Sequence, residues 1–281
     1  MPKLFSCFSW NVEHFGGNAS TDTVEFKQKV ERIAAVIKNE NPDIFAIYEV
    51  RGEEVFFEFM NLFTGYQFFI TEGPETQEIL VGIRSGFTAF VTQRLEFNAG
   101  NPYLRPGLFL TVFVENKNYT LLFLHLKSTN TPHGWGTRDF MIEKVRSLKK
   151  ALNNKAENPD DVRYIVMGDL NTMGMNYTYG DKDITQNEEI DRIEDLLSPA
   201  SYNMRRLVKS HDYTFYNGSG SSTPPSDLDH VFATQNINFK IFNSHEVNVK
   251  GLTNHPLNSQ AQDDWIAQHS DHAYLYFEVL D

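Results

Sequence analysis

Residues 26–48 read FKQKVERIAAVIKNENPDIFAIY, and this stretch indicates the fold class. Its first part has apolar residues at helical spacing, namely Phe26, Val30, Ile33, Ala34 and Ile37. Asn41-Pro42 ends the predicted helix, because proline lacks the backbone N–H that would continue it. The apolar run 43–48 follows at once and predicts a strand, and another strand begins upstream at Leu4. The order strand, helix, strand is typical of α/β proteins.

Further apolar runs continue this alternation along the chain. Strands are predicted at 67–71, 79–83, 87–92, 108–114, 119–125, 163–167, 228–233, 239–242 and 274–279. Helices are predicted at 138–152 and 188–197, and loops at 131–138 and 217–226. Residues 115–118 read as a hairpin turn, so part of the sheet structure is antiparallel. No linker divides the chain, and we expect one domain over residues 1–281.

Composition excludes several classes of protein. The 281 residues include 25 Lys and Arg against 37 Asp and Glu, which gives a net charge of −12 with neutral histidines. This balance argues against wrapping nucleic acid through charge alone, although local cations and a bound metal can still form a nuclease site. The one cysteine, Cys7, excludes an intramolecular disulfide. We find no secretory leader and no apolar run long enough for a membrane helix, so we expect a cytoplasmic protein without an obligate protein partner.

Polar and titratable residues recur where the predicted strands meet their loops. They are Asn11, Glu49, His125, Asp169, Asn171, Asp229, Asp271 and His272. Each one alone is ordinary, because Asp and Asn cap helices and start turns. As a set, carboxylate and amide oxygens without cysteines suit Mg²⁺ or Mn²⁺, and two histidines supply proton transfer. The combination predicts metal-assisted hydrolysis of a phosphoester.

The motifs around these residues resemble those of the endonuclease/exonuclease/phosphatase superfamily, in the order of that family. They are Ser9-Trp10-Asn11-Val12, Tyr48-Glu49-Val50, Leu124-His125-Leu126-Lys127-Ser128, Gly168-Asp169-Leu170-Asn171, Asp227-Leu228-Asp229-His230-Val231 and Ser270-Asp271-His272. The resemblance implies a four-layer α/β/β/α sandwich, in which two mixed sheets pack together with helices outside. It also implies that Glu49 is the principal ligand of Mg²⁺ or Mn²⁺, with Asn11 and Asp271 beside it.

The resemblance assigns the remaining residues to catalysis. Asp229 is expected to orient His272, which acts as the general base, with His125 as the general acid. Asp169 and Asn171 are expected to hold the attacking water and the developing charge on the phosphate. Other members of the family use the residue at the position of Asp169 as the base, and the sequence leaves this choice open.

Three further residues are expected to contact substrate. Arg105 resembles the arginine that deoxyribonuclease-like enzymes set against the scissile phosphate. Arg84 is expected to be a second cation near the cleft. Trp135 either stacks on a base or covers the end of a helix.

These features predict a divalent-metal-dependent phosphodiesterase, foremost a nuclease that acts on DNA or RNA. The His-Leu-Lys-Ser motif at His125 places the chain with the deoxyribonuclease-like branch. One alternative is a phosphatase or phosphodiesterase for a small or lipid-linked phosphoester. Another is a binding protein that has kept the scaffold without catalysis, which is disfavoured because every metal and proton-transfer position holds a competent residue.

Overall fold

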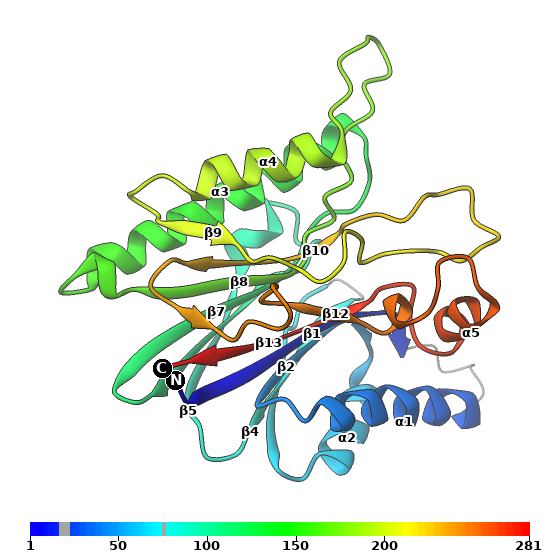
Figure 1. The fold of residues 1–281 in the computed structure, drawn as a ribbon, viewed down its shortest axis with the longest axis horizontal. Helices are drawn as coiled ribbons and strands as arrows, with labels where there is room; N and C mark the ends of the chain where they lie inside the picture. Colours follow the sequence, from blue (N-terminus) through cyan, green and yellow to red (C-terminus); the bar gives the residue numbers. More distant parts are fainter. Residues whose placement is uncertain (17–22, 75–76) are drawn as a thin grey trace.

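Two β-sheets pack face to face in the structure, with helices on their outer faces (Figure 1). The computed structural model describes residues 1–16, 23–74 and 77–281. α1 (Thr23–Glu40) and α2 (Glu53–Leu62) cover one sheet, while α3 (Pro132–Lys155) and α4 (Gln186–Leu197) cover the other. The predicted α/β fold of four layers, with mixed sheets inside and helices outside, is therefore confirmed.

The first sheet contains seven strands of the described chain, in the order β11-β13-β1-β2-β4-β3 with β12 beside β13. They are β1 (Lys3–Gly16), β2 (Ile44–Arg51), β3 (Tyr66–Ile70), β4 (Glu78–Arg84), β11 (Asn238–Phe239), β12 (Asn248–Lys250) and β13 (Tyr274–Leu280). β1 runs parallel to β2, and α1 lies between them in the chain. This is the predicted strand, helix, strand unit, which parallel neighbours require because a tight turn would reverse the chain.

The second sheet contains six strands within the described ranges, in the order β5-β6-β7-β8-β10-β9. They are β5 (Thr88–Arg94), β6 (Gly107–Val114), β7 (Lys117–His125), β8 (Arg163–Asp169), β9 (Met204–Arg206) and β10 (Asp229–Thr234). β7 is parallel to β8, and β8 is antiparallel to β10. Glu115 and Asn116 make the predicted hairpin turn between β6 and β7 with positive φ at both residues, which matches the twist of the strands.

The central strands are buried on both faces. In β1, Phe5 and Cys7 belong to the core between the sheets, whereas Phe8 and Trp10 pack in the layer beneath α1 and α2. Such strands have nearly continuous apolar sequences, which is why they were recognisable without an alternating pattern. Most of the site residues stand at or directly beside the ends of strands, and Asn11 lies within β1, so a rigid scaffold holds them.

Several short elements differ from the prediction. α3 begins at Pro132 rather than at residue 138, because Thr131 caps its amino end by accepting a hydrogen bond from the Gly134 N–H. The two glycines of its first turns hide the helical pattern. α2, α5 (Gln260–Gln268), β9 and β12 were not predicted, and β11 ends at Phe239 instead of residue 242. No helix of the described ranges is long and apolar enough to cross a membrane.

Asp43, directly before β2, ties three strands of the first sheet together. Its carboxylate accepts hydrogen bonds from Lys3 Nζ at 3.0 Å, Ser6 Oγ at 2.8 Å and Arg84 Nε at 2.9 Å. Burial alone would raise the pKa of Asp43, but the hydrogen bonds from Lys3 and Ser6 outweigh it and lower the pKa below its ordinary value.

We expect Asp43→Asn to destabilise the fold by about 1–3 kcal/mol at neutral pH, because an amide cannot accept all three bonds. A lowered pKa in the folded state means that the stabilisation is present above about pH 4 and is lost as the pH falls through the folded pKa. Urea unfolding between about pH 6 and about pH 3 should therefore show a steeper loss of stability for the wild type than for the variant. Parallel pH profiles of the two proteins would contradict this role.

Candidate active site

The predicted site residues come together at one edge of the paired sheets. The group consists of Asn11, Glu49, His125, Asp169, Asn171, Asp229, Asp271 and His272. In the second sheet, strand register places His125 beside Asp169, and Asp169 beside Asp229. The first sheet joins this row through Asn11, whose Nδ2 donates to Asp169 Oδ2 at 2.9 Å. The site therefore lies across the junction of the two sheets.

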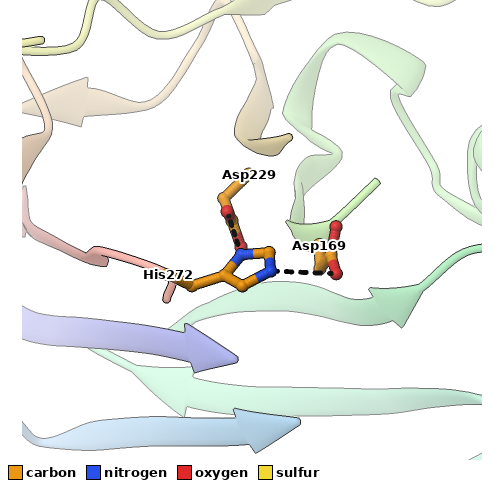
Figure 2. Close-up of side chains that lie close together, drawn as sticks. All are labelled: Asp169, Asp229 and His272. Carbon is orange, nitrogen blue, oxygen red and sulfur yellow. Dashed lines mark hydrogen bonds and ion pairs between the residues drawn. The ribbon is translucent and has the colours of Figure 1, made fainter. Parts of the chain in front are cut away.

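His272 and Asp229 form a buried hydrogen-bonded pair (Figure 2). His272 Nδ1 lies 2.8 Å from Asp229 Oδ2, and the other ring nitrogen, Nε2, lies 4.0 Å from Asp169 Oδ2. Asp229 thus fixes the orientation of the imidazole and directs Nε2 toward Asp169. This is the geometry expected of a histidine that exchanges a proton at Nε2.

The carboxylates around His272 carry an excess of negative charge. Burial opposes protonation of His272, but Asp229 and Asp169 outweigh it and raise the pKa of His272 to about 10. Burial raises the pKa of Asp169 to about 7, although the charge of His272 opposes that shift. Burial also raises the pKa of Asp271 to about 6, and nearby Glu13 and Glu49 add to the effect. An added cation would relieve this repulsion.

Asn11, Glu49 and Asp271 form a set of oxygen donors with unused capacity. Asn11 Oδ1 and Asp271 Oδ1 are buried and have no hydrogen-bond partner in the described part of the chain. Asn11 Nδ2 lies 3.3 Å from Glu49 Oε1, and the Ser270 hydroxyl donates to the Asn11 carbonyl at 2.7 Å. Buried oxygens without donors are costly unless something coordinates them. These residues fit a hard divalent cation such as Mg²⁺ or Mn²⁺.

A second group of possible ligands lies next to this set. Asp169, Asp229 and His272 each offer an atom within 4.8 Å of the others. His272 Nδ1 is engaged by Asp229, and Nε2, the one ring nitrogen left to His272, faces Asp169 at 4.0 Å. Asn11, Glu49 and Asp271 thus stay the predicted cation ligands, and Asp229 and His272 stay the predicted proton-transfer pair.

His125 is held as a neutral imidazole. Arg105 Nη2 lies 3.1 Å from His125 Nε2, and because arginine only donates, this nitrogen accepts. Burial and the nearby charges of Arg105 and His272 lower the pKa of His125 well below its ordinary value. His125 Nε2 is also 3.5 Å from Asp169 Oδ2. The general-acid role that the resemblance implied thus requires His125 to take up a proton when substrate displaces Arg105.

The three predicted substrate contacts have different outcomes. Arg105 lies at the site, where it also donates to Gln77. The prediction for Arg84 is wrong, because Arg84 ends β4 beside Asp43, at the opposite end of β2 from Glu49. Trp135 lies in the first turn of α3 under the Arg192 guanidinium, 5.8 Å from the ring centroid. That contact packs α3 against α4, and a stacking role for Trp135 stays a prediction.

Two residues around Glu49 were not predicted. The His14 N–H donates to Glu49 Oε2 at 3.0 Å, and Gln77 Nε2 donates to the same oxygen at 2.6 Å. Gln77 therefore connects Glu49 to Arg105, because its Oε1 accepts from the guanidinium. Burial alone would raise the pKa of Glu49, but the hydrogen bonds from the His14 N–H and the Asn11 side chain outweigh it and lower the pKa. Neither His14 nor Gln77 belongs to a motif, since each reaches Glu49 across more than 25 positions of sequence.

A polar clamp, consisting of Thr172, Gln186, Lys209, Asp227 and His230, was also missed. Gln186 Nε2 donates to the Thr172 and Asp227 carbonyls at 2.7 and 3.1 Å, which joins the turns that follow β8 and precede β10. His230 Nε2 lies 2.9 Å from Thr172 Oγ1 and 3.0 Å from the Asp227 carbonyl. The clamp therefore fixes the two turns that carry Asp169 and Asp229 relative to each other.

Lys209 is the charged member of the clamp. Only 5% of its side chain is exposed, and its Nζ donates to the Asp227 carboxylate and, at 2.7 Å, to the Asp229 carbonyl. Lys209 thus holds the main chain at Asp229 without contacting His272. It is a positioning residue for the Asp229–His272 pair.

We expect Lys209→Met to cost about 3 kcal/mol of stability, because Asp227 keeps a buried charge without its ammonium partner. The double variant Lys209→Met/Asp227→Asn should recover most of that stability, since both charges are gone. Its kcat should stay at least about tenfold below wild type with KM unchanged, because Asp229 is no longer held in place. Urea unfolding and steady-state kinetics measure the two effects. Wild-type kcat in the double variant would show that Lys209 serves stability alone.

Comparisons with known proteins agree with this geometry. The profile of the Endonuclease/Exonuclease/phosphatase family matches residues 8–272. No curated protein matches the sequence. TDP2 of D. rerio, complexed with a single-strand DNA product, has 16% identity over 98% of each chain and a TM-score of 0.64.

Two other solved structures have the same fold. The human Nocturnin catalytic domain with a bound sulfate anion has 14% identity over 99% of this chain and 94% of its own, with a TM-score of 0.63. The mannosyl-6-phosphatase Bt3783 of Bacteroides thetaiotaomicron has 15% identity over 98% of this chain and 99% of its own, with a TM-score of 0.61. The family profile spans the strands that carry both the oxygen donors and the Asp229–His272 pair. The chain belongs to the endonuclease/exonuclease/phosphatase family.

Proposed function

We propose that this phosphoester hydrolase is a divalent-metal-dependent phosphodiesterase that cuts DNA or RNA by in-line attack of water on phosphorus. The proposal rests on one observation, that a hydrogen-bonded His–Asp pair and a group of unpartnered oxygen donors lie at the same site. The Asp229–His272 pair, with its 2.8 Å hydrogen bond, stands next to the unpartnered buried oxygens of Asn11 and Asp271. Phosphoester hydrolysis requires both a proton acceptor for water and compensation of the phosphate charge.

Each residue has a defined task in this reaction. A divalent cation bound by Asn11, Glu49 and Asp271 would supply Lewis acidity to a phosphoryl oxygen. His272 and Asp169 face each other across 4.0 Å. A bound cation would offset the carboxylate charge that raises the pKa of His272, and a water between the two groups can then lose its proton to either one. The Asn171 side chain donates to the Leu126 carbonyl at 3.2 Å, which fixes the loop beside Asp169. Arg105 can exchange its contact with His125 for a phosphate oxygen.

Nucleic acid is the substrate we favour among phosphodiesters. TDP2 of D. rerio has the same fold and was solved with a DNA product. Arg105 provides a guanidinium, which suits bidentate recognition of a phosphate. The mannosyl-6-phosphatase has the fold as well, so hydrolysis of a small phosphoester is the alternative outcome of the test below.

A hydrolysis panel tests the proposal. Supercoiled plasmid, single-stranded DNA, RNA, a phosphoinositide, mannose 6-phosphate and bis-p-nitrophenyl phosphate would each be incubated with Mg²⁺, Mn²⁺ or EDTA. We expect cleavage of DNA or RNA that EDTA abolishes. His272→Ala should lower kcat by about 10²–10⁴-fold, because the proton acceptor is lost.

His245→Ala is the matched control, since His245 hydrogen-bonds Asn248 of β12 and has no hydrogen bond to the site residues named above. It should cut at the wild-type rate. Full activity of His272→Ala would contradict the proposed chemistry. Activity confined to the phosphoinositide, to mannose 6-phosphate or to the simple ester would overturn the nuclease assignment and keep the hydrolase.

A further inference from the structure

A polar cavity lies at the opposite end of the second sheet from the active site. It has a volume of about 440 Å³, within the range of about 300–1,000 Å³ that is usual for small-molecule sites. Its walls include Val162, directly before β8, and Thr234, at the end of β10. Asp169 and Asp229 stand at the other ends of these same strands. The cavity is therefore separate from the catalytic residues.

The feature that distinguishes this cavity is Lys149 of α3. Lys149 is only 2% exposed, and it lies on the buried face of the helix. Its ammonium makes one hydrogen bond, at 2.7 Å, to the neutral Asn153 Oδ1. Within the described ranges, no carboxylate oxygen lies within 4.0 Å of Lys149 Nζ, although Asp160 stands in the cavity wall. Buried lysines are rarely left without a counter-charge, because desolvation of the ammonium is costly.

The helix itself does not provide that counter-charge. The negative end of a helix dipole acts within the last turn, and α3 continues for six residues from Lys149 to Lys155. Lysine carries three N–H donors, and two of those on Lys149 have no acceptor among the described residues. An anion in the cavity would supply both the charge and the acceptors.

The rest of the wall suits a phosphate group. Lys150 adds a second positive charge, against the single carboxylate of Asp160. The side-chain amides of Asn154 and Asn203 line the cavity and make no hydrogen bond with the described chain, so their N–H groups can donate to anionic oxygens. Asn153 Nδ2 donates to the Ser201 carbonyl at 2.9 Å, which holds the wall together.

We propose that the cavity around Lys149 is a binding site for a phosphate group, either inorganic phosphate or a phosphomonoester. Lys149, Lys150 and Asp160 together leave the wall with a net positive charge, which favours the negative charge that such a group carries near neutral pH. The proposal does not depend on the activity proposed above, because none of its residues belongs to the catalytic site.

The test measures the reactivity of the Lys149 amine in the wild-type protein. Trace acetylation with acetic anhydride transfers an acetyl group to an uncharged lysine amine and releases acetate, and peptide mass spectrometry quantifies each lysine. Burial lowers the pKa of Lys149 to about 8, so near that pH a large share of its amine is reactive. Inorganic phosphate and glycerol 3-phosphate would be titrated separately, with chloride and acetate at equal ionic strength.

We expect either phosphate ligand to slow acetylation of Lys149 several-fold and to leave the exposed lysines of the same sample unchanged. Protection by inorganic phosphate alone would identify the free ion as the ligand, and protection by glycerol 3-phosphate alone would identify an ester. Lys150→Met should raise the phosphate concentration for half-protection several-fold. Lys155→Met, on the same helix but outside the cavity wall, should not.

Two results would overturn the proposal. One is an acetylation rate of Lys149 that no phosphate ligand changes. The other is equal protection by chloride or acetate, which would show general screening instead of a phosphate site.

Discussion

The hydrogen bond from Asn11 Nδ2 to Asp169 Oδ2, at 2.9 Å, is the contact on which the site depends. It crosses from one sheet to the other at the edge where their strands end. The same nitrogen lies 3.3 Å from Glu49 Oε1, so one amide connects Glu49 to Asp169, while its own oxygen has no hydrogen-bond partner among the described residues. Strand register sets the remaining positions, because His125, Asp169 and Asp229 are lateral neighbours on β7, β8 and β10. The packing of the two sheets therefore also sets the geometry of the site.

Much of this arrangement was predictable from the sequence, and the reasons differ between fold and site. Long buried strands such as β1 and β8 are recognisable in the sequence as apolar runs, and the polar residue at the end of each run belongs to the site. The motifs at Asp169 and His272 then identify the family, whose fold follows. The prediction that Arg84 lies near the cleft was wrong. It rested on the charge of Arg84, whereas its partner Asp43 becomes a neighbour only when β2 and β4 pair.

The contacts between residues far apart in the chain could not be predicted from the sequence. Gln77 reaches Glu49 and Arg105 over 28 positions each, and Lys209 reaches the Asp229 carbonyl over 20. Polar residues of this kind look like ordinary loop residues in a sequence. In the structure they hold the catalytic groups in place, so a buried network has to be found in three dimensions. The neutral state of His125 has the same origin, because it depends on where Arg105 comes to lie.

The central claim is a division of labour, in which Asn11, Glu49 and Asp271 bind the cation and Asp229 and His272 move the proton. Mn²⁺ titration followed by electron paramagnetic resonance, with wild type, Glu49→Gln and Asp229→Asn, tests this division most directly. We predict that Glu49→Gln weakens Mn²⁺ binding about tenfold or more, because a charged ligand is lost. Asp229→Asn should bind Mn²⁺ as the wild type does. Loss of Mn²⁺ binding in Asp229→Asn, with binding retained in Glu49→Gln, would contradict the account and place the cation between Asp169, Asp229 and His272.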